Sequence, residues 1–132
     1  MDCIFCKIIS GEVPSLKVYE DEFTLAFLDI NPVNPGHTLV VPKKHLVNFE
    51  DADEETLCRL IKIVKKVGFS LKNNLSAPGY NVAVNNDPIA GQVVPHLHFH
   101  VIPRKENDNI KLWPQRSYAG GEATEILKKI KI

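Results

Sequence analysis

The sequence predicts a single α+β domain in which one long helix packs on a five-stranded antiparallel sheet. Five short runs of the chain are β-like, and one long stretch has helical periodicity. Most connections between the β-like runs are too short for the crossover that a parallel pair requires, so we expect antiparallel pairing. The 132 residues suffice for one buried core, and no linker or internal repeat divides them, which predicts one domain over residues 1–132.

Each predicted strand is a run rich in β-branched, aromatic or aliphatic residues that is bounded by turn residues. The five runs are, in order, Lys17–Glu20, Phe23–Leu28, His37–Val41, Tyr80–Asn85 and His96–Ile102. Asp21-Glu22 between the first two runs indicates a hairpin, and the turn cluster Asn31–Gly36 precedes the third. We expect Pro103 to end the fifth strand, because proline cannot donate to a ladder.

Helical periodicity covers residues 53–74, where apolar residues recur at steps of three and four. Those residues are Leu57, Leu60, Ile61, Val64, Val67 and Leu71. We expect Asp51 and Glu54 to form a capping box at the start of this helix, and Cys58 to be a small core residue. Residues 4–9 predict a second, short N-terminal helix.

Composition argues against two classes of partner. Lys+Arg and Asp+Glu both number 16, so no overall field attracts nucleic acid or an anionic membrane. No apolar run approaches membrane-spanning length, and the start of the chain lacks the pattern of a signal peptide. Three cysteines, an odd number, do not suggest a disulfide scaffold. We therefore expect a cytoplasmic protein that binds neither nucleic acid nor membrane.

Cys3 and Cys6 form a C-x-x-C motif, which indicates either a metal clip or a redox pair. A redox pair of the thioredoxin type follows a strand within a βαβ unit, and no strand is predicted before Cys3, so metal binding is favoured. Structural zinc takes four Cys or His ligands, and His45 and His96 could supply the other two. On spacing alone, this Cys₂His₂ site and two spare thiols beside a solvated His45 are equally open interpretations.

Three histidines, His96, His98 and His100, occupy alternate positions in the last predicted strand. Successive side chains of a strand point to opposite faces, so the three imidazoles are predicted to share one face while the apolar residues between them face the core. Imidazole suits metal ligation, proton transfer and nucleophilic attack near neutral pH. This face is therefore the predicted centre of the functional site.

The loop before these histidines, residues 85–92, carries the amides of Asn85 and Gln92 and a glycine, Gly91, that permits close backbone approach. Nucleophilic attack on phosphorus needs such donors beside a neutral imidazole, because the imidazole attacks while the donors stabilise charge on the phosphate oxygens. Two alternatives remain open on periodicity alone. One is an ordinary turn followed by outward polar histidines, and the other is a catalytic metal bound by all three histidines.

Residues 96–102, His-Leu-His-Phe-His-Val-Ile, resemble at every position the signature of the histidine-triad (HIT) family of nucleotide hydrolases and transferases, which is His-φ-His-φ-His-φ-φ with φ apolar. The resemblance extends in the same order over Ile4–Ile9, Ala26–Pro32, Gly36–His45 and Ala90–Gln92, which is most of the chain. It implies a HIT-like fold, and a homodimer in which two sheets form one continuous ten-stranded sheet.

The resemblance also implies a role for each catalytic residue. His98 would attack the α-phosphorus of a purine nucleotide derivative and form a nucleotidyl-histidine intermediate that water resolves. His100 would hydrogen-bond the phosphate oxygens, and His37 would orient the site. Asn85 and Gln92 would contact the phosphate or the bridging oxygen.

The same resemblance implies a nucleoside site and a metal site. Asp29 would bind the ribose hydroxyls, although on its own it is equally well a turn residue. An apolar slot would hold the base, although apolar residues are more often simply core, and its members are Phe5, Ile8, Phe27 and Ile30. The zinc-bearing branch of the family uses a C-x-x-C with two histidines, which would assign structural Zn²⁺ to Cys3, Cys6, His45 and His96.

One position departs from the family pattern. Many members carry Ser or Thr after the loop glutamine, where this chain has Val93. Loss of a hydroxyl that helps the leaving group would cost about 10²–10³ in rate where it acts on the transition state. The predicted substrates are nucleoside phosphoramidates, aminoacyl adenylates or dinucleoside polyphosphates. The alternatives are a nucleotide-binding or signalling module with little turnover, and a metal-dependent hydrolase that uses the three histidines as ligands.

Overall fold

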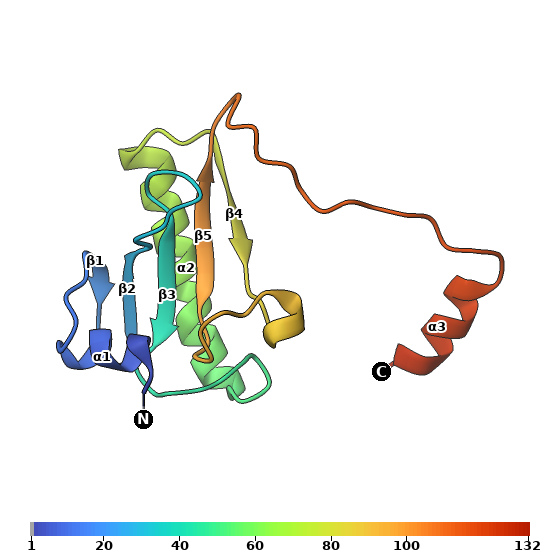
Figure 1. Cartoon of the computed structure of the whole chain (residues 1–132), viewed down its shortest axis with the longest axis horizontal. Helices are drawn as coiled ribbons and strands as arrows, with labels where there is room; N and C mark the ends of the chain where they lie inside the picture. Colours follow the sequence, from blue (N-terminus) through green and yellow to red (C-terminus); the bar gives the residue numbers. More distant parts are fainter. Residues whose placement is uncertain (1) are drawn as a thin grey trace.

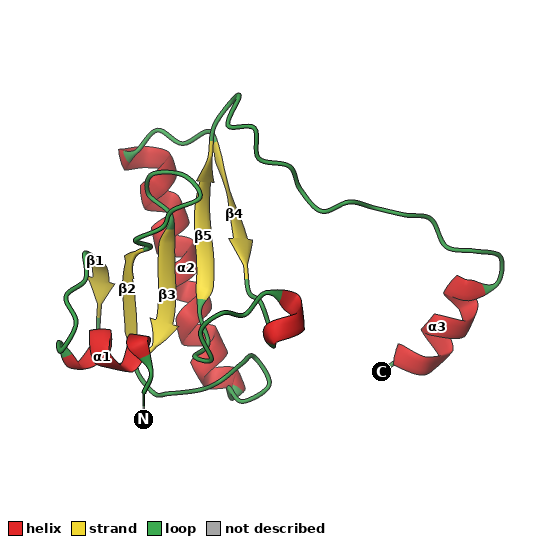
Figure 2. Ribbon diagram, in the orientation of Figure 1, coloured by secondary structure: helices red, strands yellow, loops and turns green. Residues whose placement is uncertain are grey.

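The computed structural model describes residues 2–132 and shows a five-stranded antiparallel sheet with one long helix on one face (Figures 1 and 2). The strands lie in the order β1-β2-β3-β5-β4, and their bounds are β1 Lys17–Glu20, β2 Thr24–Leu28, β3 Thr38–Pro42, β4 Gly79–Ala83 and β5 Phe99–Arg104. The helices are α1 Ile4–Ser10, α2 Glu54–Asn74 and α3 Glu122–Ile130, with a short 3₁₀ helix, η1, at Pro88–Ala90. The predicted fold class is confirmed. Within residues 2–132, none of the helices is long and apolar enough to cross a bilayer.

The prediction for the last strand was wrong at both ends. β5 begins at Phe99 rather than at His96, because the N–H of Leu97 donates to the carbonyl of Leu46, 2.7 Å away, instead of to a neighbouring strand. Pro103 lies within β5, beyond the last residue that pairs with β3, and its carbonyl accepts from the side chain of Asn34 at 2.9 Å. No ladder donor is needed there, so the proline is tolerated. The predicted alternation still holds, since the intervening apolar residues are buried, namely Leu97, Phe99 and Val101.

The main core lies between α2 and the sheet. Apolar residues of α2 pack there against inward side chains of β2, β3 and β5, and the helix contributes Leu60, Ile63, Val64, Val67 and Leu71. Asp53, not Asp51, caps this helix by accepting the N–H of Thr56 at 2.8 Å, so the predicted capping box is wrong. Cys58 is exposed rather than part of the core.

The opposite face of the sheet is covered in part by α1. Phe5 and Ile8 of this short helix pack on a second cluster of buried strand residues, which are Leu25, Phe27, Leu39 and Val41. His100 is opposite Leu39 in the ladder, so its side chain lies on this same face. The histidine site and the α2 core are therefore on opposite sides of the sheet.

The C-terminal segment leaves the sheet after β5. The carboxylate of Asp108 accepts from the guanidinium of Arg104 at 2.8 and 3.0 Å and from Asn34 at 3.2 Å, which anchors the start of this segment. Beyond it the chain extends away from the body and ends in α3, none of whose residues is buried (Figure 1). Several large apolar side chains are exposed along this arm, among them Leu112, Trp113, Tyr118, Leu127 and Ile130.

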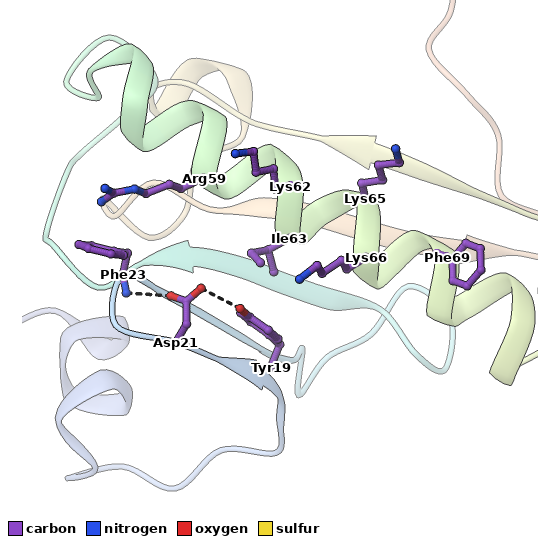
Figure 3. Close-up of a pocket in the computed structure, with 9 residues that line it drawn as sticks. All are labelled: Tyr19, Asp21, Phe23, Arg59, Lys62, Ile63, Lys65, Lys66 and Phe69. Carbon is purple, nitrogen blue, oxygen red and sulfur yellow. Dashed lines mark hydrogen bonds between the residues drawn. The ribbon is translucent and has the colours of Figure 1, made fainter.

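A hollow of about 590 Å³ lies between α2 and the β1–β2 hairpin (Figure 3). Ile63 and Tyr19 line it beside four cationic side chains of α2, which are Arg59, Lys62, Lys65 and Lys66. The guanidinium of Arg59 lies 3.6 Å from the ring centre of Phe23. This hollow is on the α2 side of the sheet, so it is separate from the histidine face.

Candidate functional site

Four predicted metal ligands meet where α1 approaches the segment before β5. The Sγ of Cys3 lies 3.4 Å and the Sγ of Cys6 3.6 Å from Nδ1 of His96, and the two imidazole Nδ1 atoms of His45 and His96 are 3.2 Å apart. The Sγ of Cys6 is also 3.3 Å from Nδ1 of His45. Zinc bonded to sulfur and nitrogen in a tetrahedron has donor–donor edges of roughly 3.3–3.8 Å. The donor types and spacings therefore fit a tetrahedral Cys₂His₂ zinc site.

The hydrogen bonding of His96 prepares it for this role. Its Nε2 lies 2.8 Å from the carbonyl of Pro42, which can only accept, so Nε2 carries the proton and Nδ1 keeps a lone pair toward the thiols. Burial lowers the pKa of His96 to about 4, which keeps the imidazole neutral as a metal ligand requires. Burial also raises the pKa of the Cys6 thiol, which weakens the interpretation of this motif as a reactive redox pair.

The hydrogen bonding of His98 leaves one of its ring nitrogens with a free lone pair. Its Nδ1 donates to the backbone carbonyl of His96 over 2.7 Å, so Nε2 of the neutral ring carries the lone pair. The ring is 6 % exposed and packs edge-on against Phe5 with centroids 5.1 Å apart. Burial lowers the pKa of His98, which favours the neutral, reactive form near pH 7.

His37 and His100 form a hydrogen-bonded relay in which both rings carry their proton on Nε2, whereas His98 carries its proton on Nδ1. The N–H of Val33 donates to Nδ1 of His37 over 3.1 Å, so the proton of the His37 ring is on Nε2. That proton is donated to Nδ1 of His100 over 2.9 Å, which leaves the His100 proton on Nε2. His98 therefore presents a lone pair, and His100 presents an N–H donor that could bind an anionic oxygen.

Burial sets the charge state of this relay. It is the main cause that lowers the pKa of His100 to about 4, and the nearby rings of His98 and His37 lower it further. Burial likewise lowers the pKa of His37. The carboxylate of Asp29 opposes these shifts without reversing them, so both rings are neutral near pH 7.

The other predicted site residues differ in burial and in how near they lie to the histidines. Asp29 lies beside the relay, with Oδ2 3.7 Å from Nε2 of His37. Phe5, Ile8 and Phe27 are buried in the second core cluster, and the ring of Phe5 packs against that of His98. Ile30 is 90 % exposed and is not among the buried residues of that cluster.

The amides of the 85–92 loop are used within the protein. Gln92 is 7 % exposed, and its side chain donates to the carbonyl of Val47 at 2.6 Å and accepts from the N–H of Asp87 at 2.8 Å. Asn85 lies across the loop, where its amide is 3.4 Å from the carbonyl of Gly91, a residue with φ of 94°. Gln92 thus braces the loop that precedes the histidines, while Asn85 is the more accessible amide.

The geometry does not support one metal held by all three histidines. Within residues 2–132, the groups of potential ligands are Cys3/Cys6/His45/His96 and Asp29/His37/His100. His98 belongs to neither group, and the strand alternation that places it between two ligand sets leaves it free for chemistry.

The sequence did not reveal the groups that determine which ring nitrogen of each histidine carries the proton. These are backbone atoms, namely the N–H of Val33 and the carbonyls of Pro42 and His96. No residue type signals them, because every residue except proline has both groups. Only the two-residue spacing of His96 and His98 hinted at a short-range contact between them.

Comparison with known proteins assigns a family to this arrangement. Residues 10–107 match the family model described as the HIT domain. The chain is 41% identical over 138 aligned positions to an adenosine 5′-monophosphoramidase of Schizosaccharomyces pombe, covering 99% of this chain and 100% of that one.

Two solved structures extend the likeness to the fold. A HIT family protein from Bacillus subtilis is 40% identical with a TM-score of 0.90, covering 98% of this chain and 95% of that one. A zinc-bound histidine triad family protein from Mycobacterium smegmatis is 37% identical with a TM-score of 0.80, covering 98% of this chain and 92% of that one.

Proposed function

The chain belongs to the HIT family, and from that premise we propose that it hydrolyses a purine nucleotide derivative at the α-phosphate through a nucleotidyl intermediate on His98. The observation that carries the proposal is the pair of opposite tautomers. His98 offers a lone pair at Nε2, and His100 offers an N–H donor at Nε2. A nucleophile beside a donor for phosphate oxygens is what phosphoryl substitution requires.

The proposed reaction has two steps on the same imidazole. Nε2 of His98 forms a bond to the α-phosphorus while the bond from phosphorus to the leaving group breaks; the leaving group departs with the bonding electron pair and is protonated from solvent. Water then attacks the phosphorus and releases a proton to solvent, the P–N bond breaks with its electron pair returning to Nε2, and the nucleoside monophosphate is released. Because His98 is neutral at the start, the N–P intermediate carries a positive ring that is a good leaving group.

The nucleotide is proposed to lie along the face that α1 partly covers. His100 and Asn85 would contact its phosphate, and Asp29 its ribose hydroxyls. Phe5, Ile8 and Phe27 would provide an apolar wall, with the ring of Phe5 against that of His98. The exposed Ile30 would close on the base only when a nucleotide is bound. Gln92 would act mainly by holding the loop in place.

Candidate substrates differ in the leaving group, and the phosphoramidate is favoured. The S. pombe relative is named as an adenosine 5′-monophosphoramidase, and this chain covers all of it. Aminoacyl adenylates and dinucleoside polyphosphates are the other candidate substrates, and the three classes together form the substrate panel. Val93, which is 89 % exposed, offers no hydroxyl to a leaving group, so slow turnover of poor leaving groups is expected.

We also propose that Zn²⁺ binds at Cys3, Cys6, His45 and His96 as a structural ion. The zinc-bound M. smegmatis relative and the tetrahedral spacing of the four donors support this. The ion would join α1 to the segment before β5, and so fix Phe5 against His98. It would take no part in the reaction itself.

A homodimer is the proposed assembly, with β4 of two copies meeting to form a ten-stranded sheet. β4 is the last strand of the sheet, so one of its sides has no partner strand among residues 2–132. The carbonyl of Pro103 points to Asn34, away from β4, so its ladder partner Tyr80 directs its own N–H and C=O outward, and so does Val82. These outward groups suit pairing with a second copy.

Steady-state kinetics test the function. The wild-type chain should hydrolyse adenosine 5′-phosphoramidate, and His98→Ala should lower kcat by roughly 10³-fold or more while AMP binding changes by only a few-fold. Turnover by His98→Ala within tenfold of wild type would contradict the nucleophile assignment. Tight AMP binding by a wild-type chain without measurable turnover on any panel member would instead favour the binding-module alternative.

A further inference from the structure

The hollow between α2 and the β1–β2 hairpin has a cationic rim on its α2 side (Figure 3). Arg59, Lys62 and Lys66 recur at steps of three and four along the helix, so they form a row roughly 10 Å long, and Lys65 lies beside them. Nζ of Lys66 lies 5.5 Å from the ring centre of Tyr19, so this lysine reaches across the hollow toward the hairpin. Within residues 2–132 the three lysines form no ion pair, which leaves their charges available to an external anion.

The same hollow has an apolar part. Ile63 is buried and lines the hollow together with the ring of Tyr19. Phe23 and Phe69 also line it, and they are exposed by 44 % and 69 %. Exposed aromatic side chains beside a hollow are typical contact points for the apolar side chains of a partner. A ligand that fits this surface must therefore combine negative charge with apolar groups.

The hairpin side of the hollow has the opposite charge, which argues against nucleic acid. Asp21 lines it, and its carboxylate accepts from the hydroxyl of Tyr19 at 2.8 Å. The next residue, Glu22, is exposed and forms no ion pair within residues 2–132. These carboxylates repel a continuous row of phosphates, and acidic and basic residues balance over the whole chain, so no general field attracts a polynucleotide.

The surface suits a protein segment better than a small ligand. Small-molecule sites fix their ligand with a few polar groups that are already held in place, whereas the lysines here are exposed and unpaired within the described residues. A row of such cations beside an apolar strip matches an acidic amphipathic helix. The carboxylates and the apolar side chains of such a helix recur at the same steps of three and four residues.

We propose that this hollow binds an acidic amphipathic segment of another protein. The carboxylates of the segment lie along Arg59, Lys62 and Lys66, and its apolar side chains pack on Ile63 and Phe69. The site is on the α2 side of the sheet, away from the histidines, and it lies beside β1, the edge opposite to β4. A nucleotide on the histidine face and a second copy at β4 therefore leave it accessible.

A second copy of the chain offers two other occupants, and neither has both required features. α3 is amphipathic, but Glu122 and Glu125 are balanced in it by Lys128 and Lys129. The segment at residues 50–55 is acidic, but it contains no large apolar side chain. The combination of charge and apolar surface therefore favours a different protein.

Fluorescence anisotropy with a designed peptide measures this binding. The probe is a fluorescein-labelled peptide of about 15 residues, with leucine at every third or fourth position and glutamate at most others. The wild-type chain should bind it with a Kd of roughly 1–50 µM. Lys62→Glu/Lys66→Glu should weaken binding by about tenfold or more, whereas Lys105→Glu/Lys111→Glu, at two exposed lysines elsewhere, should change it by less than about twofold. A wild-type chain that does not bind, or equal affinities of the two double variants, would overturn the proposal.

Further arms of the same experiment test the apolar contact and the class of ligand. Phe69→Ser should weaken peptide binding by about fivefold or more without lowering Tm, because Phe69 is exposed. Polyglutamate of the same length and duplex RNA should each bind at least about tenfold more weakly than the peptide, and equal binding of either would overturn the proposal in favour of a general polyanion site.

Light scattering on the same variants tests the other occupant. Lys62→Glu/Lys66→Glu should have the same mass in solution as the wild type. A lower mass for this variant would mean that a second copy fills the hollow, and would overturn the proposal. None of these measurements uses turnover, so failure of the proposed hydrolase activity would leave their results unchanged.

Discussion

Backbone hydrogen bonds decide which nitrogen of each histidine can react. The carbonyl of Pro42 accepts a hydrogen bond from Nε2 of His96, and the carbonyl of His96 accepts one from Nδ1 of His98. His96 therefore presents Nδ1 to the thiols, and His98 presents Nε2 to the open face. Two histidines separated by one residue thereby present different nitrogens, one suited to the proposed metal site and the other to the proposed nucleophile. Burial reinforces both assignments, since it lowers the pKa of each ring and keeps its lone pair free.

Burial of His100 predicts a pH dependence of stability. Its pKa is about 4 in the folded chain and about 6.5 in an unfolded one, so the unfolded state binds more protons between these values. Stability is therefore fully present above pH 6.5 and is lost as the pH falls toward 4, by up to about 1.4 kcal/mol per pH unit for this group. Urea unfolding of wild type and His100→Asn across pH 4.5–7.5 measures the difference.

Comparing wild type with His100→Asn removes the contributions to stability that both proteins share, including those of other titrating groups and of metal loss at low pH. The wild-type free energy of unfolding should fall more steeply than that of His100→Asn below pH 6.5. Parallel curves would mean that His100 is not held neutral by burial.

At the scale of elements, the loop 85–92 depends on one buried amide. Gln92→Ala removes the hydrogen bonds to the N–H of Asp87 and to the carbonyl of Val47, and each such bond contributes about 0.5–1.5 kcal/mol, so the two together should contribute about 1–3 kcal/mol. We expect that loss in chemical denaturation. Gln115→Ala, at an exposed glutamine of the C-terminal arm, is the matched control and should change stability by less than about 0.5 kcal/mol.

The proposed zinc site predicts a large effect of single cysteines. Cys6→Ser or chelation should lower Tm by at least about 10 °C, because a structural zinc ion contributes several kcal/mol to folding. Cys58→Ser provides the control, since Cys58 is exposed and far in sequence from the motif. Equal Tm values for Cys6→Ser and Cys58→Ser would show that no structural ion is bound.

The accuracy of the predictions from sequence also differs between elements. Helical spacing located α2 to within a residue, and the alternation of residues 96–101 correctly separated the apolar residues of the α2 core from the histidines on the other face. It misplaced the ends of β5, because Leu97 bonds to a loop and Pro103 extends past the end of β3. Such partners come from parts of the chain distant in sequence, so a local pattern contains no trace of them.

For the whole molecule, two features have no packing partner within residues 2–132. They are the outer edge of β4 and the C-terminal arm that ends in α3. A nine-residue helix such as α3 is not stable alone in water, so an amphipathic α3 without buried residues requires a surface to pack on. The proposed homodimer would supply one. In light scattering, the chain should have twice its 14.8 kDa mass.

A proline at each edge of the sheet tests where the copies meet. Val82→Pro removes an outward N–H at β4 and should yield a folded monomer. Lys17→Pro makes the same change at β1, the opposite edge. There the N–H of Leu28 donates to the carbonyl of Leu16, so Lys17 and its partner Phe27 direct their own backbone groups away from each other, and the dimer should stay intact. A monomeric wild type, or a dimer that survives Val82→Pro but not Lys17→Pro, would contradict pairing through β4.

The central claim is that His98 becomes covalently attached to the nucleotide. Rapid-quench mass spectrometry of the intact chain, mixed with adenosine 5′-phosphoramidate, measures this directly. We expect an adduct with the mass of one adenylyl group in the wild type, located on His98 by peptide mapping and absent from His98→Ala. An adduct on another residue, or turnover with no adduct at any quench time, would contradict the account.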